Sequence, residues 1–577
     1  MIRKSLLLLG GLLCAGSVRV DAQSAPVMGY MEEDRLLDRL ESLNGAFSDD
    51  LHLSARPLYQ KDVARYLLQL KSNIYDAAVT NVDMYNINKL LYTQAEWLHE
   101  VGGTSVYQGT ANPVRPLYNN PTQLLEYNRP GKFYFSINPK LGVQYLYDRQ
   151  EDKSEESRMH LAAGFELKTT VSDILNLYVE YTYNSEDPAF IFRQYEQQYQ
   201  AVPGAGRYSR SNDGVWSYNL WRGQADLKVL KDHMNLSIGY GKHFIGDGYR
   251  SLMLSDFSEA AWFAGLQTRV WKLKYQNIYT LYQPQSIYMG YTGATQEYKF
   301  ATTHHLSTNL FRWLNVGLFE SVIFGRQDRY EFGYLNPVIF YRSVERAMGS
   351  PDKILIGINA KAIPVKSVNM YGQFILNEFS ASEFFSSNGY WANKWGAQLG
   401  IKYYDAFSVP NLDLQLEGNA VRPFTYTSNV KMGGQILTNY SHYNQALAHP
   451  LGAAFRELVF NMRYQPVRRL KIDGRAMLVQ QTIDNGSAVS NGVNILRNYD
   501  QRTANYGFKI VDPDNSRQVM LFNLNIGYEL RMNTYIDIGA TYRSESYTSL
   551  GMIPAFNTLN VYAGLRMNLK RRDYAVF

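Results

Sequence analysis

Two histidine-containing motifs are the first candidates for chemistry in this sequence. His99 and Glu100 begin like the His-Glu-x-x-His helix of zinc hydrolases, but Val-Gly-Gly follows, so the second histidine ligand is missing. His304 and His305 are adjacent in a segment that we expect to be a strand, where neighbouring side chains point to opposite faces. Two side chains that diverge in this way are poorly placed to share a metal ion, so we expect no metal site here.

A third set, Ser441, His442 and His449, lies in one long expected loop. A serine hydrolase needs a serine and a histidine within hydrogen-bond reach, and the sequence leaves that arrangement open as a minor alternative. The chain has no Gly-x-Ser-x-Gly elbow and no phosphate-binding loop motif. We therefore expect a protein that is not an enzyme and that has no cofactor.

Charged residues around a glycine-rich turn form the first candidate ligand site. Lys242, Asp247, Arg250 and Asp256 surround two closely spaced glycines, which permit a tight reversal of the backbone. These four side chains could line a lumen and contact either an acidic sugar or one another. We favour the second interpretation, in which an ion network pins a loop that folds inward.

A second candidate site follows the Tyr-Leu-Asn-Pro sequence that begins at Tyr334. It comprises Asn336, Arg342, Glu345 and Arg346, in a connection too long to be a turn. We expect this loop to fold inward as a constriction or plug, in preference to direct contact with a ligand.

The elements that must position these residues are strands, because alternation with a period of two begins at Lys132 and continues from there. In the segment Asn560–Leu569 the odd-numbered positions are apolar, whereas the even-numbered ones are Asn, Tyr, Gly, Arg and Asn. Segments of about 10–14 residues exceed the usual strands of soluble sheets and suit tilted spanning of a bilayer. About 18 such segments lie between Lys132 and Leu569, an even number as in bacterial single-chain barrels.

The connections between these segments alternate in length. Short ones include Thr170–Asp173 and Met532–Asn533, and long ones include Arg326–Asp352 and Pro423–Leu451. Short turns at one end and long loops at the other are typical of outer-membrane proteins. The sequence therefore predicts a mostly β fold: an 18-stranded antiparallel outer-membrane β-barrel with a small N-terminal α-helical bundle.

The domain organisation follows from the shift between helical and strand periodicity. Leu36, Leu40 and Leu43 have helical spacing, and two further amphipathic stretches follow Arg56. We predict a signal peptide over 1–22, a periplasmic helical bundle over 23–103, a linker over 104–131, the transmembrane barrel over 132–570 and a C-terminal tail over 571–577. The bundle enters from the short-turn side, so we expect the long loops to face outside the cell.

The composition agrees with an exported barrel. The single cysteine, Cys14, lies in the expected signal peptide, so the mature chain would have no disulfide. No second apolar run reaches the length of a transmembrane helix, and interleaved polar residues account for the mean hydropathy of −0.32. Tyrosine is abundant, with 46 residues, and its amphipathic ring favours membrane interfaces. The net charge of +6 is small for 577 residues and gives no argument for nucleic acid binding.

Two resemblances add specificity. Tyr562, Gly564, Met567 and Leu569 resemble the C-terminal signal by which the barrel-assembly machinery recognises outer-membrane proteins. The chain also resembles the capsule assembly Wzi family, whose Bacteroidetes-type branch includes the gliding motility protein RemB. That resemblance rests on these stretches: Leu36 and Leu40, Gly45, Arg56-Pro57, Gly239–Asp256, Tyr334–Pro337, Phe340, Tyr341, Arg342, Glu345 and Gly349–Asp352.

The family resemblance implies an 18-stranded barrel with a periplasmic helical bundle and a role in attaching or organising surface polysaccharide. The long loops are idiosyncratic, so the ligand cannot be carried over. The expected partners are surface polysaccharide, outer-membrane lipid and the barrel-assembly machinery, with a motility or secretion apparatus as a further protein partner. Loop aromatics are the expected sugar-stacking residues, with loop packing or an interface girdle as the alternative: Tyr195, Tyr199, Tyr208, Trp391 and Tyr440.

Three alternatives remain open at this point. The chain could be a surface component of gliding motility or cell adhesion, in which case the barrel anchors a protein. A diffusion channel for small solutes requires an open lumen. An outer-membrane lipase or protease requires a Ser/His pair on the outer side.

Overall fold

The structure is a computed structural model of the whole chain. It describes residues 26–27, 31–72, 79–97, 124–150, 155–172, 174–230, 233–283, 298–325, 330–337, 352–378, 380–386, 388–428, 431–432, 435–436, 438–484, 489–502, 504–548 and 555–574. The predicted signal peptide, most of the predicted linker, and Arg342, Glu345 and Arg346 lie outside these ranges.

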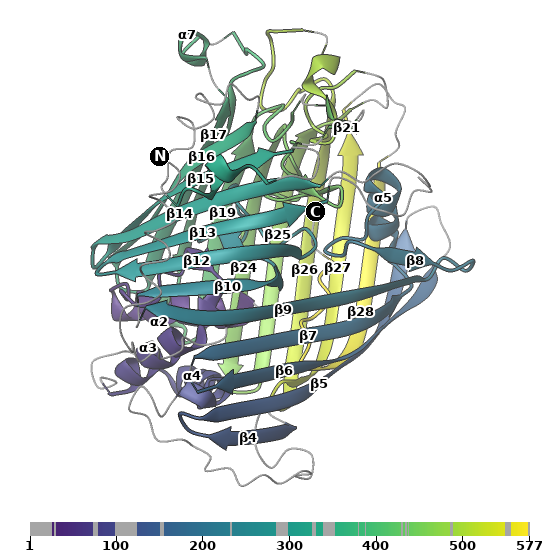
Figure 1. The fold of residues 1–577 in the computed structure, drawn as a ribbon. Coiled ribbons are helices and arrows are strands. Elements are labelled where there is room, and N and C mark those ends of the chain that lie inside the picture. The colour runs from purple at the N-terminus through teal and green to yellow at the C-terminus, as the bar shows by residue number, and fades with distance from the viewer. Residues whose placement is uncertain are drawn as a thin grey trace, which may run out of the picture.

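Eighteen antiparallel strands close into a barrel, which confirms the predicted fold class (Figure 1). In chain order these are β5 (Phe133–Gln150), β6 (Glu156–Val171), β7 (Leu175–Glu186), β9 (Trp216–Leu230), β10 (Met234–Gly241), β12 (Ala261–Val270), β13 (Leu273–Tyr282), β14 (Lys299–Phe311), β15 (Leu314–Phe324), β16 (Lys353–Val365), β17 (Val368–Glu378), β18 (Lys394–Tyr403), β19 (Leu412–Val421), β24 (Phe455–Val467), β25 (Leu470–Thr482), β26 (Ser516–Arg531), β27 (Thr534–Tyr547) and β28 (Phe556–Met567). The ring closes where β28 pairs with β5.

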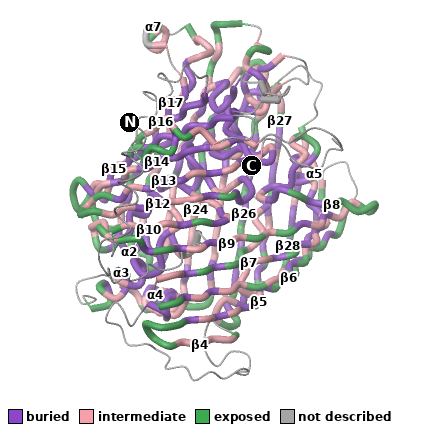
Figure 2. The backbone as a smooth tube through the Cα atoms, viewed as in Figure 1, coloured by how far each residue is buried: buried purple, intermediate pink, exposed green. Residues whose placement is uncertain are grey.

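The barrel wall exposes apolar side chains and buries polar ones. In β28, Val561 and Leu565 are 40% and 45% exposed, whereas Asn560 and Tyr562 are each 3% exposed. The same alternation of exposed and buried positions runs along the neighbouring strands (Figure 2). An apolar outer face and a polar interior suit a wall with hydrocarbon outside, so the molecule is a barrel of the outer-membrane type.

The seam of the barrel is built from three strands. β28 pairs with β5 along residues 141–150, and the five-residue strand β4 (Leu125–Arg129) pairs with β5 along residues 133–137. β4 lies within the range 104–131 that we predicted as a linker, so the end of that range joins the sheet. Its sequence is too short and polar to show the period of a strand, and the pairing uses the half of β5 that β28 leaves free.

The N-terminal helices are α2 (Met31–Asn44), α3 (Gln60–Ser72) and α4 (Asn81–Thr93), followed by the short helix η2 (Ala95–Trp97). A capping box begins α4, because the Thr80 side chain accepts from Asp83 N and the Asp83 side chain accepts from Thr80 N. The helices share a buried apolar core that includes Leu37, Leu67 and Leu90. No helix among the described residues is long and apolar enough to cross a bilayer.

These helices lie in the mouth of the barrel at the short-turn end (Figure 1). The sequence predicts a helical bundle at this end, and it does not predict that the helices lie inside the mouth. The difference arises because charged and polar side chains of the helices and of the loop after α2 match partners on the inner wall. Short turns that connect the strands at this end have residues with positive φ, such as Ser172, Trp271 and Asn533.

The long connections gather at the opposite end, as predicted. The described parts of these connections include the helices α5 (Phe190–Tyr199) and α7 (Ala381–Phe384). The remaining short elements are β1 (Pro26–Val27), β2 (Ala55–Arg56), β3 (Leu58–Tyr59), β8 (Tyr208–Arg210), β11 (Phe244–Ile245), β20 (Lys431–Met432), β21 (Gln435–Ile436), β22 (Ser441–His442), β23 (Gln445–Ala446), η3 (Phe332–Leu335), η4 (Ala406–Ser408) and η5 (Tyr499–Gln501).

Candidate functional site

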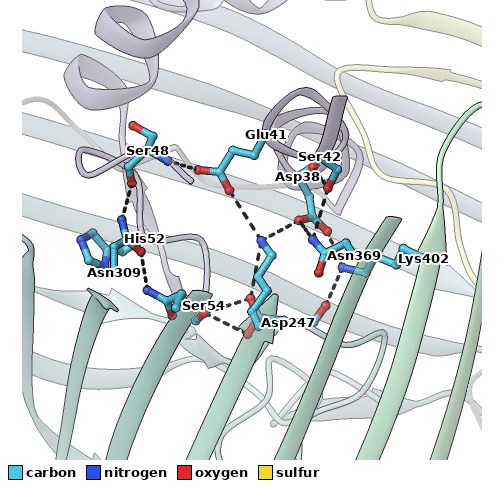
Figure 3. Close-up of polar contacts among 12 residues, drawn as sticks. Asp38, Glu41, Ser42, Ser48, His52, Ser54, Asp247, Asn309, Asn369 and Lys402 are labelled. Atoms are coloured by element: carbon cyan, nitrogen blue, oxygen red, sulfur yellow. Dashed lines mark hydrogen bonds and ion pairs between the residues drawn. The ribbon is translucent and has the colours of Figure 1, made fainter. Parts of the chain in front are cut away.

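Helix α2 is held in the lumen by a carboxylate with four polar neighbours. Figure 3 shows Asn369 and Lys402 beside Asp38. Asp38 Oδ1 lies 2.6 Å from Lys361 Nζ and accepts from Asn369 Nδ2 at 2.9 Å. Asp38 Oδ2 accepts from Tyr404 OH at 2.9 Å and from Lys402 Nζ. Burial by itself would raise the pKa of Asp38, but the ammonium groups of Lys361 and Lys402 hold that pKa below its ordinary value.

A second ion cluster joins α2 to α4 and to the turn between β18 and β19. Arg39 lies at its centre and is 4% exposed. Its Nε atom donates to Asp83 Oδ1 at 2.8 Å and its Nη2 atom donates to Asp405 Oδ1 at 2.7 Å, while Nη1 donates to Asp413. One buried guanidinium therefore ties two N-terminal helices to the barrel wall.

Glu41 gives the docked helix a pH dependence that can be measured. Its Oε1 atom accepts from Ser48 N at 2.9 Å and its Oε2 atom lies 3.6 Å from Lys361 Nζ, while Asp38 and Asp247 add negative charge nearby. Burial raises the pKa of Glu41 to about 7. A carboxyl group with a raised pKa stabilises the fold fully below its unfolded pKa, and this stability is lost as the pH rises through the folded pKa.

We therefore expect the thermal stability of the N-terminal helices to fall between about pH 5 and about pH 8, and Glu41→Gln to flatten that slope. Helical circular dichroism during heating, recorded across this range in detergent, measures the effect. Asp213→Asn, at an exposed loop position, is the matched control and should keep the wild-type slope. Parallel slopes for Glu41→Gln and the wild type would contradict the assignment.

The connection between β10 and β12, residues 242–260, folds into the lumen and meets the N-terminal segment there. Its strand β11 pairs with β2, and Gly246 N donates to Ser54 O at 2.7 Å. Gly246 has a φ of +147°, and an added Cβ would lie 2.2 Å from Gln373 Nε2 on the inner wall. A side chain at this position would push the loop off the wall, so glycine is required here.

The structure places all four residues chosen from this loop inside the barrel. Asp247 accepts from Ser54 Oγ at 2.9 Å, and Lys242 donates to the backbone oxygens of Gly204 and Asp256 at 3.1 and 3.3 Å. Arg250 Nη2 lies 3.5 Å from Glu457 Oε1 on β24. Their partners are therefore mostly on other elements, and the one direct link among the four uses the Asp256 backbone.

Two carboxylates of the inner wall fix the loop further, and sequence reasoning missed both. Glu417 on β19 accepts from Tyr249 N at 2.6 Å and from Arg250 N at 3.1 Å. Glu457 lies 2.8 Å from His449 Nε2, which ties the long loop before β24 to the same network. Inward-facing acids are difficult to identify from sequence, because a polar lumen position can equally face water.

The second predicted loop does not fold inward in the part that the structure describes. Residues 330–337 pack against the outer face of β14–β16, where Tyr334 is buried with Val322, Phe324 and Ile354. Thr302 Oγ1 donates to Tyr334 O at 3.1 Å. Asn336 is exposed. The inward plug is therefore wrong for this segment, because its two tyrosines bury their rings against apolar side chains of the outer wall.

A cavity of about 370 Å³, lined by many charged residues, lies between α2, α4, the inward loop, the barrel wall and the C-terminal tail. The tail turns back into the barrel after β28: Arg571 Nη2 lies 3.1 Å from Asp473 Oδ2, and Arg475 Nη1 lies 2.8 Å from Asp573 Oδ2. The Tyr574 ring stacks on Phe192 of α5 with ring centroids 5.5 Å apart. Residues 575–577 lie outside the described ranges.

The loop aromatics chosen from the sequence fall into two groups. Tyr195, Tyr208 and Tyr440 are buried at 7%, 6% and 2% exposure, so their faces are unavailable to a sugar. Tyr199 is half-buried beside Tyr195, with ring centroids 4.6 Å apart. Trp391 is half-buried among the long loops and lies at the centre of an aromatic cluster.

This cluster, which we call the Trp391 patch, consists of Tyr390, Trp391, Tyr499, Arg502 and Tyr506. The ring centroids of Trp391 and Tyr499 are 4.9 Å apart, and Tyr390 lies 5.4 Å from Tyr506. Arg502 Cζ lies 3.9 Å from the Trp391 ring centroid. Tyr506 is 51% exposed, so rings from two distant loops form one accessible surface. Sequence analysis found only Trp391, because the other residues meet it through loop folding.

The residues considered for hydrolysis are engaged elsewhere. Ser441 Oγ accepts from Lys299 Nζ at 3.1 Å, and His442 Nδ1 accepts from Gln283 N at 2.9 Å while Nε2 lies 3.0 Å from Ala260 O. His304 Nδ1 bonds to Tyr275 OH and His305 Nε2 to Asn359 Oδ1, each at 2.9 Å. Among the described residues no group of three or more His, Cys, Asp or Glu side chains is arranged to hold a metal ion.

Comparison with known proteins gives structural but not sequence matches. No family model matches the chain, and no curated protein does. Wzi of Escherichia coli, described as an outer-membrane protein involved in group 1 capsule assembly and as a carbohydrate-binding β-barrel, matches with 12% identity over 95% of this chain and 100% of that chain, at a TM-score of 0.55. OccAB2 of Acinetobacter baumannii matches with 10% identity over 74% of this chain and 98% of that chain, at a TM-score of 0.40.

At 12% identity the match to Wzi shows the fold, and it extends over both the barrel and the N-terminal helices. The chain is therefore an 18-stranded outer-membrane β-barrel with the fold of Wzi.

Proposed function

We propose that this protein holds or orders capsular or extracellular polysaccharide at the cell surface, without catalysing a reaction. The observation that carries the proposal is the Trp391 patch, an accessible set of aromatic rings with a guanidinium at the long-loop end. The apolar faces of sugar rings stack on aromatic side chains, and the arginine can donate to hydroxyl or carboxylate oxygens. The fold shared with a carbohydrate-binding barrel supports the same function.

In this proposal the short-turn end with the N-terminal helices faces the periplasm and the long loops face outside the cell. The lumen serves as a rigid support and does not serve as a passage, because α2 and the loop over 242–260 both bind to its inner wall. This arrangement argues against a diffusion channel for small solutes. The last strand, β28, would be the segment that the barrel-assembly machinery recognises, and the apolar outer wall would contact outer-membrane lipid.

A strain from which the gene has been deleted tests the proposal. We expect such cells to release surface polysaccharide into the medium while total polysaccharide stays constant, and complementation with the wild-type gene to restore retention. Unchanged retention would overturn the proposal. Poor spreading with an intact capsule would instead support the alternative of a motility or adhesion component that binds a protein partner.

A further inference from the structure

Three cations that line the lumen cavity have no carboxylate within ion-pair distance among the described residues, although Asp473, Asp413 and Asp256 attract them over longer distances. Arg35, Arg463 and Lys570 form no ion pair and no hydrogen bond with any residue that the structure describes. Neighbouring arginines in the same cavity are paired: Arg475 with Asp573 at 2.8 Å and Arg566 with Asp537 at 2.6 Å. The three unpaired groups are therefore an exception in a lumen where charges are generally matched.

The three cations come from separate elements that line the same cavity. Arg35 lies on α2, Arg463 faces inward from β24 and Lys570 begins the C-terminal tail. Burial and the nearby positive charge of Arg463 lower the pKa of Arg35 while Asp473 opposes that shift, which places the two guanidinium groups within electrostatic range of each other and of one carboxylate. Fourteen Lys or Arg and ten Asp or Glu line the cavity. Two of these cations, Lys89 and Arg566, pair with Glu529 and Asp537, which lie outside the lining, so a smaller positive excess faces the cavity.

Like charges that face each other in a partly buried space cost free energy unless an anion lies between them. The cavity also has groups suited to hydroxyls, since Asn461, Asn523 and Asn525 line it. Asn525 is 5% exposed, and its Oδ1 atom has no hydrogen-bond partner among the described residues. A volume of about 370 Å³ is within the range of small-molecule sites.

We propose that this cavity binds a hydroxylated carboxylate of the size of an acidic monosaccharide, with its carboxylate between Arg35, Arg463 and Lys570. A guanidinium fork matches a carboxylate in two parallel hydrogen bonds, which favours carboxylate over a spherical anion. The amide groups of Asn461 and Asn525 bind the hydroxyls. This site is internal and does not depend on the Trp391 patch, so it goes beyond the proposed function.

Calorimetric titration of the full chain in detergent tests the site, with glucuronate as the probe, glucose as the neutral match and inorganic phosphate as the second anion. We expect the wild-type protein to bind glucuronate saturably, to give no heat with glucose, and to bind phosphate at least tenfold more weakly than glucuronate. We expect Arg35→Gln and Arg463→Gln each to bind glucuronate at least tenfold more weakly than the wild type does. Arg456→Gln, on the outer face of the same strand, is the control and should bind like the wild type. Equal binding of glucuronate and glucose, equal binding of glucuronate and phosphate, or wild-type affinity in both variants would overturn the proposal.

Thermal unfolding without added anion gives a second readout. Replacing a residue that has a structural role lowers the stability of the protein. Arg35→Gln instead removes a repulsion, so this variant should unfold at the same temperature as the wild type or at a higher one. A lower unfolding temperature would contradict the proposal.

If either arginine variant fails to give the heat-dependent mobility shift of a folded barrel, Lys570→Gln tests the same site from the exposed tail. Polysaccharide binding through the Trp391 patch should be unchanged in all three variants, which separates the two hypotheses.

Discussion

Replacing Asp38 with alanine is expected to release the N-terminal helices from the barrel. The substitution leaves the buried Lys361, 3% exposed, with the more distant carboxylates of Glu41 and Asp247 at 3.6 and 3.8 Å. It also removes the carboxylate partner of Lys402 on the neighbouring wall. Loss of one member of a buried ion pair costs about 3–5 kcal/mol, because the remaining charge stays desolvated. At about 1.4 kcal/mol for each factor of ten, trypsin cleavage within residues 31–97 should accelerate by about 100-fold or more.

Limited proteolysis of the folded protein in detergent, followed by mass spectrometry of the fragments, measures this effect. Asp213→Ala removes an exposed carboxylate from a loop between β8 and β9 and should be cleaved at the wild-type rate. The barrel of the Asp38 variant should still show a heat-dependent mobility shift, since the wall strands keep their pairing. Cleavage of Asp38→Ala at the wild-type rate would show that the carboxylate does not hold α2.

The second large effect is expected at the long-loop end, where Trp391→Ala should weaken binding of purified surface polysaccharide by at least tenfold. Trp391 contacts Tyr499 and Arg502, so its removal takes away the central ring of the patch and a stacking partner of the arginine. Buried or half-buried tryptophans at the centre of a binding surface commonly contribute more than about 2 kcal/mol.

Biolayer interferometry with immobilised polysaccharide gives the affinity. Trp271→Ala is the matched control, because Trp271 is 79% exposed in the turn between β12 and β13 at the opposite end of the barrel. It should bind as tightly as the wild type. If the two variants lose affinity equally, or if neither does, the Trp391 patch is not the sugar-binding surface.

The barrel could be predicted from sequence because its two faces meet different surroundings. In β28 every step from Asn560 to Met567 changes the side chain between a polar interior and an apolar exterior, and this local pattern needs no knowledge of distant contacts. The alternation of short turns and long loops could also be recognised from the sequence, because it is a local pattern too. Both predictions are confirmed by the ring of eighteen strands.

The parts that sequence reasoning missed depend on contacts between distant segments. Arg39 meets Asp413 across 374 positions of the chain, and nothing near Arg39 indicates that α2 enters the lumen. Tyr506 joins Tyr390 because two long loops fold together. The loop around Asn336 was predicted to turn inward because of its length, whereas its described part packs on the outer wall through apolar contacts of Tyr334.

That outward-packed loop changes what surrounds the barrel. Beneath it, Thr302 points outward from β14, yet it is 0% exposed and bonds to Tyr334 O. Elsewhere on the wall, outward positions carry leucine, valine and aromatic residues. The annulus of lipid around this barrel is therefore interrupted on one side, where polypeptide replaces acyl chains, and neighbouring lipids meet a wider molecule with an asymmetric rim.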